Sequence, residues 1–233
     1  MGKKCFWGPA VKRVYVVTEG QSETNFVNKV LVPYFVDYEK LLIPTTVLTK
    51  SDEQKGRMYK GGMRSYAKAH LTIKRNLSLV KDSDTFVTTM FDFYALPTDT
   101  PGYQDMASLT DPYKKILGIE KAMFDSEKLT KPVYIPYIQL HEFEALLFSN
   151  LDILADAYFE YDITPLKTCL AEKQNPELIN NGAETAPSKR IIKCIPDYDK
   201  VTMGVSVLEK IGVDTLCKTC KHFSEWIGKI KKL

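Results

Sequence analysis

The chain has 233 residues, of which 44% are hydrophobic and 26% charged, and its formal net charge at pH 7 is +3. These ordinary globular values exclude a disordered or collagen-like chain and suggest one domain, with or without a small appendage. No stretch approaches about 18 apolar residues, so we expect no membrane span, and the N-terminus lacks the apolar run of a secretory signal. The odd number of cysteines, five, is typical of free thiols in a reducing cytoplasm.

Hydrophobic patterning predicts alternating strands and helices. Residues 11–18 hold an almost continuous β-branched run, which predicts a buried strand, and Ser22 is a suitable N-cap for the helix that follows. A second strand is expected over residues 41–48, although Pro44 weakens it, and a long helix is expected over 63–80.

The alternation continues through the middle of the chain. Residues 85–91 are rich in β-branched side chains and predict a third strand, and residues 111–124 favour a helix. A fourth strand is expected over 132–140, followed directly by a helix over 141–149. Strands that alternate with helices imply crossover connections and a mainly parallel sheet, so the fold class is α/β.

We expect the chain to divide into a larger N-terminal core and a smaller C-terminal extension. Residues 1–150 should form the α/β core, with helices flanking the sheet. The mostly helical pattern of residues 151–233 predicts a C-terminal extension packed on that core. No internal repeat or low-complexity tract is visible.

Charge is segregated along the sequence. Residues 50–81 contain nine basic and two acidic side chains, whereas residues 82–127 contain nine acidic side chains and three lysines. Arg64, Lys68 and Arg75 are spaced by four and seven positions, so they can share one face of a helix. Such a basic stripe can neutralise phosphates, but a solvated helix face is the plainer interpretation.

Acidic residues stand where the predicted strands end. Glu19 follows the first strand, Asp92 follows the third, and Glu142 and Glu144 follow the fourth. Parallel strands bring their carboxyl ends to one edge of a sheet, so these side chains can converge. Converging carboxylates repel each other unless a divalent cation neutralises them, and oxygen-only ligation suits Mg²⁺ or Mn²⁺. For any single acid, a place at a helix start is the alternative.

Four segments of the chain resemble a known bacterial family. The most specific are the Asp-Phe-Tyr-x-Leu-Pro block that starts at Asp92 and the His-Glu-Phe-Glu-Ala-Leu-Leu-Phe block that starts at His141. The four segments are 14–23, 88–97, 139–148 and 186–191. They resemble, in the same order and over nearly the whole chain, the Toprim-like domain-of-unknown-function family 4276. This family includes the second component of AbiL-type abortive-infection systems.

The resemblance implies a Toprim fold, a small doubly wound sheet shared with topoisomerases, primases and overcoming-lysogenization-defect nucleases. It also implies a partner, usually an ATPase of the ABC or SMC-like class encoded beside the gene. It would make the chain a Mg²⁺- or Mn²⁺-dependent nuclease that binds one or two of these ions. The nuclease would act on nucleic acid in the cytoplasm and would have no membrane partner. No ATP site is recognisable on the chain itself, and the sequence leaves the oligomeric state, including a homo-oligomer, open.

The family's site residues carry over position by position. Glu19 matches the Toprim glutamate after the first strand, and Asp92 matches the first aspartate of the usual Asp-x-Asp pair. The second position of that pair is Tyr94, which puts the ligand of a second metal in doubt. Three acids are candidates to replace it: Asp99, Glu142 and Glu144.

Lys189 matches a lysine in the family's Pro-Ser-Lys-Arg segment, which resembles the late lysine near the active site of related nucleases. It would stabilise the non-bridging phosphate oxygens, and we expect Arg190 beside it to contact nucleic acid. On a helix, Glu142 and Glu144 would point about 200° apart, so only one would face the site. We prefer Glu144, since Glu142 can cap a helix instead.

Two further features favour structural roles. His141 stands beside the acids, but a structural hydrogen-bonding histidine is the favoured interpretation. Cys217, Cys220 and His222 have the spacing of half a zinc site, whereas a closed site needs four ligands and no second pair stands nearby.

The sequence supports one main hypothesis and two alternatives. The main one is a metal-dependent nuclease effector of a phage-defence module. The first alternative is a catalytically degenerate Toprim that serves as an interaction or regulatory subunit of the ATPase, and the broken Asp-x-Asp pair favours it. A primase-like nucleotidyl transferase is disfavoured because no nucleotide-binding motif is visible.

Overall fold

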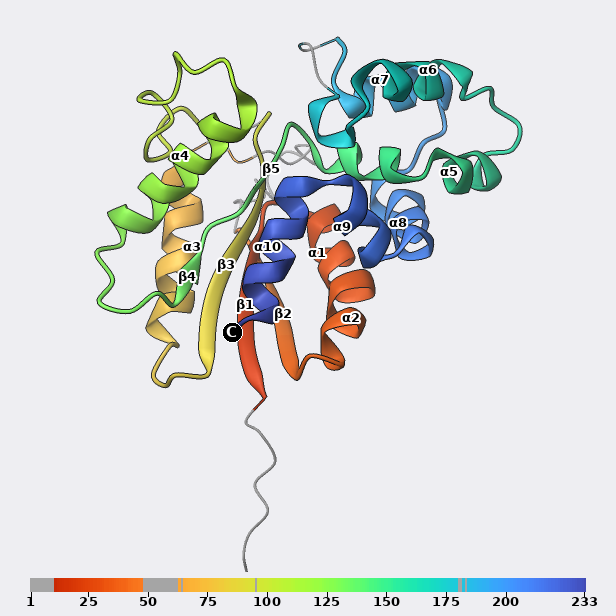
Figure 1. Ribbon diagram of the computed structural model, residues 1–233. Helices are drawn as coiled ribbons and strands as arrows, with labels where there is room; N and C mark the ends of the chain where they lie inside the picture. Colours follow the sequence, from red (N-terminus) through yellow and green to blue (C-terminus); the bar gives the residue numbers. More distant parts are fainter. Residues whose placement is uncertain (1–10, 48–62, 64, 95, 180–181, 183) are drawn as a thin grey trace, which may run out of the picture.

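The computed structural model describes residues 11–47, 63, 65–94, 96–179, 182 and 184–233. Within them, a sheet of five strands lies between two layers of helices (Figure 1). The strands are Lys12–Thr18 (β1), Lys40–Thr46 (β2), Thr85–Asp92 (β3), Tyr134–Ile135 (β4) and Ile138–Gln139 (β5).

All strand pairs in this sheet are parallel, and the order is β2-β1-β3-β4, with β5 continuing on the same side of β3. Thr18, the last residue of β1, is opposite Thr46 on one neighbour and Met90 on the other. The predicted α/β class, the mainly parallel sheet and the adjacency of the first and third strands are therefore confirmed. The carboxyl ends of β1 and β3 meet at one edge of the sheet.

Each central strand is buried on both faces. Towards one face, Val17 and Phe91 pack in a core with α3 (Tyr66–Ser78) and α4 (Pro112–Ser126). Towards the other, Val14 and Met90 pack in a second core with helices from both ends of the chain. Burial on both faces explains why these strands are almost continuously apolar rather than alternating.

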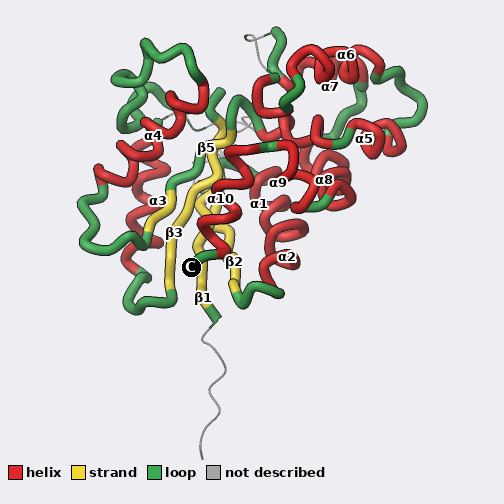
Figure 2. The backbone as a smooth tube through the Cα atoms, viewed as in Figure 1, coloured by secondary structure: helices red, strands yellow, loops and turns green. Residues whose placement is uncertain are grey.

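The second face is covered by one long N-terminal helical segment and by three C-terminal helices. The N-terminal segment consists of α1 (Gln21–Phe26), a π-helical turn η1 (Val27–Leu31) and α2 (Val32–Val36). The C-terminal helices are α8 (Val205–Ile211), α9 (Val213–Thr219) and α10 (Lys221–Lys231). Figure 2 shows how these red segments flank the yellow strands.

Short helices between β5 and α8 form a lobe beside the carboxyl edge of the sheet (Figure 1). They are η2 (Phe143–Ser149), α5 (Leu151–Ala157), α6 (Thr164–Lys173), η3 (Pro176–Leu178), α7 (Pro187–Cys194) and η4 (Lys200–Gly204). The helices η2 and η3 are of the 3-10 type and η4 is a π-helical turn.

Two predicted elements differ in detail. The single strand expected over 132–140 is two short strands, because Pro136 has no N–H to donate to the ladder and the Tyr137 N–H is bound by the Thr89 hydroxyl at 2.9 Å. The α-helix expected over 141–149 is a 3-10 helix that begins at Phe143. Pro44 is accommodated because β2 is an edge strand.

The C-terminal helices share a hydrophobic core with the sheet. Trp226 of α10 is buried, stacks on Tyr137 with ring centroids 4.2 Å apart, and donates a hydrogen bond to the Thr88 hydroxyl of β3 at 2.9 Å. The division at residue 150 stays a prediction. Among the described residues, no helix is both long and apolar enough to cross a membrane.

Candidate functional site

The ends of β1 and β3 are joined by an acidic side chain. Glu19 follows β1, and its carboxylate accepts hydrogen bonds from the backbone N–H of Met63 at 3.0 Å and of Asp92 at 3.5 Å. Asp92 is the last residue of β3. The register of the sheet therefore brings together two of the acids that the sequence placed at strand ends.

A third acid enters from the first turn of α1. The Glu23 side chain is buried, and its Oε2 accepts a hydrogen bond from the Gly20 N–H at 3.0 Å. This contact holds the side chain at the strand-to-helix turn. The sequence prediction does not include Glu23. The signal is present, because a helix that starts directly after Glu19 and Gly20 must place position 23 in its first turn beside the strand end.

A lysine lies among the acids. The Lys200 ammonium, at the start of η4, is 3.2 Å from Glu144 Oε2, 3.5 Å from Glu23 Oε1 and 3.8 Å from Asp92 Oδ2. We call the four acids Glu19, Glu23, Asp92 and Glu144 the carboxylate cluster. Three of these carboxylates contact the one ammonium, and Glu19 lies beside Asp92, so the site keeps a net negative charge when all groups are ionised.

Two local contacts position Lys200. Asp199 caps the π-helical turn by accepting hydrogen bonds from the N–H groups of Val201 at 2.9 Å and Thr202 at 3.2 Å. The Asn25 side chain of α1 donates to the Val201 carbonyl at 3.2 Å. The turn is thereby held against α1, and π-helical turns often occur at functional sites.

Burial dominates the electrostatics of the cluster. It raises the pKa of Glu19, Asp92 and Glu144 above their ordinary values, and the Lys200 charge only partly opposes this in each case. Burial alone would lower the pKa of Lys200, but the attraction of Asp92, Glu144 and Glu23 outweighs it and raises that pKa overall. Lys200 is therefore cationic at neutral pH, and further positive charge would stabilise the ionised acids.

Two predicted ligands are bound to helix N-termini instead. Glu142 accepts hydrogen bonds from the Ser188 N–H at 2.9 Å and the Ser188 hydroxyl at 3.0 Å, at the start of α7. Asp99 accepts hydrogen bonds from the Ser65 hydroxyl at 2.8 Å and the Tyr66 N–H at 2.9 Å, at the start of α3. Both carboxylates therefore accept hydrogen bonds at helix starts, and their role as metal ligands stays a prediction.

The predicted basic residues are spread over the surface. Lys189 is exposed on α7, and Arg190 next to it donates from Nε to the Thr185 carbonyl at 2.7 Å. Lys68 and Arg75 are both exposed on α3. Arg64 lies outside the described residues. Within the described part of the chain, the lysine that contacts the carboxylate cluster is Lys200, which the sequence did not single out.

His141 lies at the same edge of the sheet. Its backbone has a left-handed φ of 61°, and its carbonyl accepts a hydrogen bond from the Tyr94 N–H at 2.8 Å. Burial lowers the pKa of His141 to about 4, so this imidazole is neutral at physiological pH. The other histidine of interest, His222, is buried and bonded through Nε2 to Glu120 at 2.8 Å, which gives it a structural partner.

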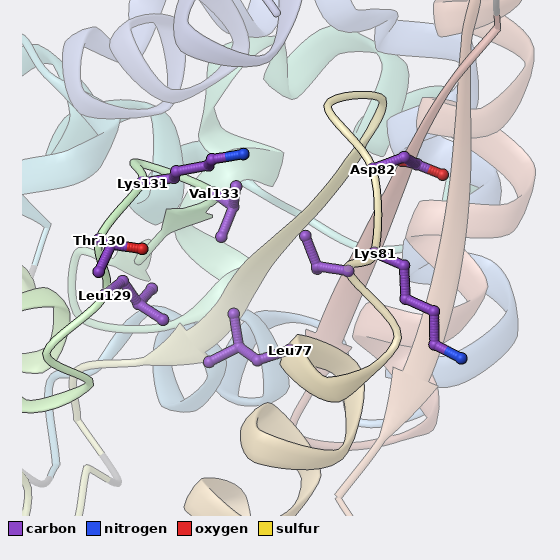
Figure 3. A pocket seen from close by; sticks show the side chains of 8 residues that line it. Leu77, Lys81, Asp82, Leu129, Thr130, Lys131 and Val133 are labelled. Carbon is purple, nitrogen blue, oxygen red and sulfur yellow. The ribbon is translucent and has the colours of Figure 1, made fainter.

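A separate pocket of about 210 Å³ lies at the opposite edge of the sheet (Figure 3). Its lining residues are Leu77, Val80, Lys81, Asp82, Leu129, Thr130, Lys131 and Val133. These residues precede β3 and β4, whereas the carboxylate cluster lies where β1 and β3 end. The Lys81 and Lys131 side chains extend in different directions in Figure 3, so they do not form a single anion site.

The donor set fits a hard divalent cation. All the acidic donors are carboxylate oxygens, which Mg²⁺ and Mn²⁺ prefer. Glu144 Oε2 is buried and, apart from its ion pair with Lys200, has no hydrogen-bond partner among the described residues. As they stand, no three His, Cys, Asp or Glu side chains in the described part of the chain are grouped closely enough to hold a metal ion.

Residues 18–231 match the family model described as "Domain of unknown function (DUF4276)". The chain belongs to this family. No curated protein and no solved structure has a significant match to it. The match confirms the family resemblance of this DUF4276 protein over nearly the whole chain. The description of the family names no activity.

Gly204 offers a test of how tightly the Lys200 turn is packed. A Cβ at Gly204 would lie 2.5 Å from the Tyr198 hydroxyl oxygen and 3.2 Å from Cζ of the same ring. Because the Tyr198 ring would have to move, we expect Gly204→Ala to lower the free energy of unfolding by about 1–3 kcal/mol in urea titrations. Gly228→Ala in α10 is the matched control, since nothing lies within 4 Å of its Cβ and alanine favours helix. Equal stability of the two variants would contradict this packing.

Proposed function

We propose that this DUF4276 protein is a Toprim-like, Mg²⁺- or Mn²⁺-dependent nuclease and the effector of a phage-defence module. The observation that carries the proposal is the convergence of Glu19, Asp92 and Glu144 with Glu23 at the carboxyl edge of a parallel sheet. Open α/β sheets form their sites at that edge. Buried carboxylates whose pKa is raised are in turn typical of functional sites.

The Toprim assignment rests on placement. A glutamate follows the first strand and an aspartate ends the strand beside it, as in the Toprim pattern, and the two strands are parallel neighbours. The second aspartate of that pattern is Tyr94, which is half-exposed. Glu23 and Glu144 are the acids that would take over its role, because both contact the same ammonium as Asp92.

In the proposed reaction, Glu19, Asp92, Glu144 and Glu23 would hold one or two cations. Bound there, the metal would supply a nucleophilic water and stabilise charge on the phosphate. Glu19 is fixed for this role by two backbone N–H groups, and Glu23 by one. Lys200 is placed to offer positive charge to the non-bridging phosphate oxygens, and exposed Lys189 is a second candidate for that role.

A non-catalytic function has its own support. The ion pairs of Lys200 with three acids would also stabilise a degenerate site, and Tyr94 breaks the usual acidic pair. In that case the chain would act as an interaction subunit of the ATPase that the family resemblance implies. The alternative predicts no cleavage under any metal condition.

The direct test is a cleavage assay with the purified full chain. Single- and double-stranded DNA and RNA are incubated with Mn²⁺, with Mg²⁺ and with a chelator, both with and without the ATPase encoded alongside. The nuclease proposal predicts cleavage that requires the metal. Absence of cleavage in every condition, together with intact phage defence when Glu19 is replaced in cells, would favour the interaction subunit.

The basic stripe predicted from Arg64, Lys68 and Arg75 is the proposed contact for the phosphate backbone, and of these three residues Lys68 and Arg75 lie exposed on α3. Replacing Arg64, Lys68 and Arg75 together by alanine should weaken nucleic-acid binding and reduce the slope of log affinity against log salt by up to about three. Three exposed lysines on other elements serve as the control, replaced together by alanine: Lys29, Lys114 and Lys210. Fluorescence anisotropy over a salt series measures both slopes. Equal slopes for the two triple variants would identify the predicted basic stripe as a solvated face.

A further inference from the structure

The Lys200 ammonium lies among carboxylates that require a positive charge nearby. It contacts three buried or nearly buried carboxylates, of Glu144, Glu23 and Asp92, whose side chains are 2%, 6% and 13% exposed. The Phe143 ring adds a cation–π interaction, since its centroid lies 5.6 Å from the same Nζ. In the metal-free protein this ammonium therefore supplies the positive charge that a cluster of buried carboxylates requires.

We propose that Lys200 is a tethered counter-ion that stabilises the metal-free cluster and that a divalent cation must displace it. This inference rests on the proposed function, because it assigns the carboxylate cluster to Mg²⁺ or Mn²⁺. To the proposed function the inference adds a regulated step of metal binding. The protein whose Lys200 is paired with the acids is a stable resting form, and the cation competes with the lysine for the oxygens of Glu23, Asp92 and Glu144.

The acids also have contacts that do not involve the lysine. Glu19 is bound by the N–H groups of Met63 and Asp92, and Glu23 Oε2 by the N–H of Gly20, so only Glu23 Oε1 is directed to Lys200. Asp92 is fixed by the β3 backbone and Glu144 by a buried 3-10 helix. A cation that replaces the ammonium would therefore meet carboxylates on fixed backbones, whose oxygens still have to draw in from the 3.2, 3.5 and 3.8 Å at which they surround Nζ.

Lys200, by contrast, is partly exposed to solvent. Its side chain is 35% exposed. A flexible aliphatic stem joins the ammonium to the backbone at Lys200, the first residue of η4. A divalent ion carries twice the charge of an ammonium and can accept several carboxylate oxygens, so it competes well for the same place. The displaced ammonium would remain at the rim of the site, where a phosphate anion can bind it.

The experiment compares four full-length proteins: wild type, Lys200→Gln, Lys200→Arg and Lys210→Gln. Lys210→Gln is the matched control, because it makes the same charge change at an exposed position of α8. Mn²⁺ affinity is measured by isothermal titration calorimetry, and the melting temperature is measured in chelator and in saturating Mn²⁺. Neither readout depends on enzymatic activity.

We expect Lys200→Gln to bind Mn²⁺ about tenfold more tightly than wild type or more, because the competing charge is gone. Its melting temperature in chelator should fall by several degrees, and Mn²⁺ should restore most of the loss. Lys200→Arg should stay close to wild type in both measurements, since it keeps the charge, and Lys210→Gln should match wild type.

The outcomes separate the two levels of the proposal. If wild type and Lys200→Gln bind Mn²⁺ equally well, the displacement model is wrong and the metal site stands. If none of the proteins binds Mn²⁺, both the displacement model and the metal-dependent function are wrong. If Lys200→Gln folds only with Mn²⁺ and unfolds in chelator, the inference is supported. If it fails to fold even with Mn²⁺, Lys200 has a structural role that a cation cannot replace, and the inference is overturned.

Discussion

Glu19→Gln is expected to reduce metal-dependent cleavage by more than about a hundredfold, since even the outer-shell partners of metal ligands typically account for 10- to 100-fold. The substitution removes the negative charge that attracts a cation. It keeps the size of the side chain and an amide oxygen that can still accept the Met63 N–H. Initial cleavage rates at fixed Mn²⁺ concentration measure the effect. Glu142→Gln is the matched control, because that acid caps α7 at the same edge of the sheet, and it should retain most activity.

The same variant should fold about as stably as wild type, because the loss of the Asp92 N–H contact, which needs a second oxygen, opposes the gain from removing a buried charge. Burial raises the pKa of Glu19, so the folded protein binds the proton more readily than the unfolded chain does. The stability that this proton contributes is present below the unfolded pKa and is lost as pH rises through the folded pKa. Above that range, the neutral amide of the variant avoids the cost of a buried charge. Thermal unfolding in chelator at neutral pH checks this, and cleavage equal to wild type by a folded Glu19→Gln would contradict the proposed role of the carboxylate.

Trp226→Ala is expected to lower the free energy of unfolding by about 3–5 kcal/mol. The side chain is 1% exposed, stacks on Tyr137 and donates a hydrogen bond to Thr88 in the sheet. Its loss therefore leaves a cavity and removes one hydrogen bond from the Thr88 hydroxyl, which still donates to the Ile135 carbonyl. Urea unfolding measures the loss. Lys229→Ala, on the exposed side of the same helix, is the control and should change stability by less than about 0.5 kcal/mol.

Because α10 and the sheet share one hydrophobic core, the Trp226→Ala protein should still unfold in a single cooperative transition. Two separate transitions, with the sheet unaffected by the substitution, would instead show that the C-terminal helices form an independent unit. A loss of less than about 1 kcal/mol would contradict the packing of Trp226 against β3.

A buried polar network adds to the attachment of α10. The Glu177 carboxylate is fully buried and accepts hydrogen bonds from the N–H groups of His222 and Phe223, at 3.0 and 2.9 Å, in the first turn of this helix. It also accepts a hydrogen bond from the Tyr113 hydroxyl of α4 at 3.0 Å. The network therefore joins η3, α4 and α10, which are far apart in the sequence.

Local patterns in the sequence predicted the strands that build the site. The continuous β-branched runs around Val16 and Thr88 require burial on both faces, and strands of that kind are central strands of a parallel sheet. Once β1 and β3 are parallel neighbours, Glu19 and Asp92 must lie at one edge. The proximity of these two acids therefore follows from short-range patterns together with the pairing of the two strands.

The remaining cluster residues depend on long-range packing that no local pattern carries. Lys200 reaches the cluster because α1 and η4 meet through Asn25 and Val201, which are 176 positions apart. The family resemblance pointed to Lys189 because its neighbours form a recognisable motif, whereas the surroundings of Lys200 carry none. Glu142 and Glu144 differ in role because an extended residue followed by a 3-10 helix directs one to α7 and the other to Lys200.

A crystal of the wild-type protein soaked in Mn²⁺ tests the central claim most directly. Anomalous scattering locates the ion without reference to activity. The carboxylate site predicts a peak within about 2.5 Å of oxygens from Glu19, Asp92 and Glu144, with the Lys200 ammonium moved away from them. At saturating Mn²⁺, a cluster with no anomalous peak and with Lys200 still paired to Glu144 would contradict it.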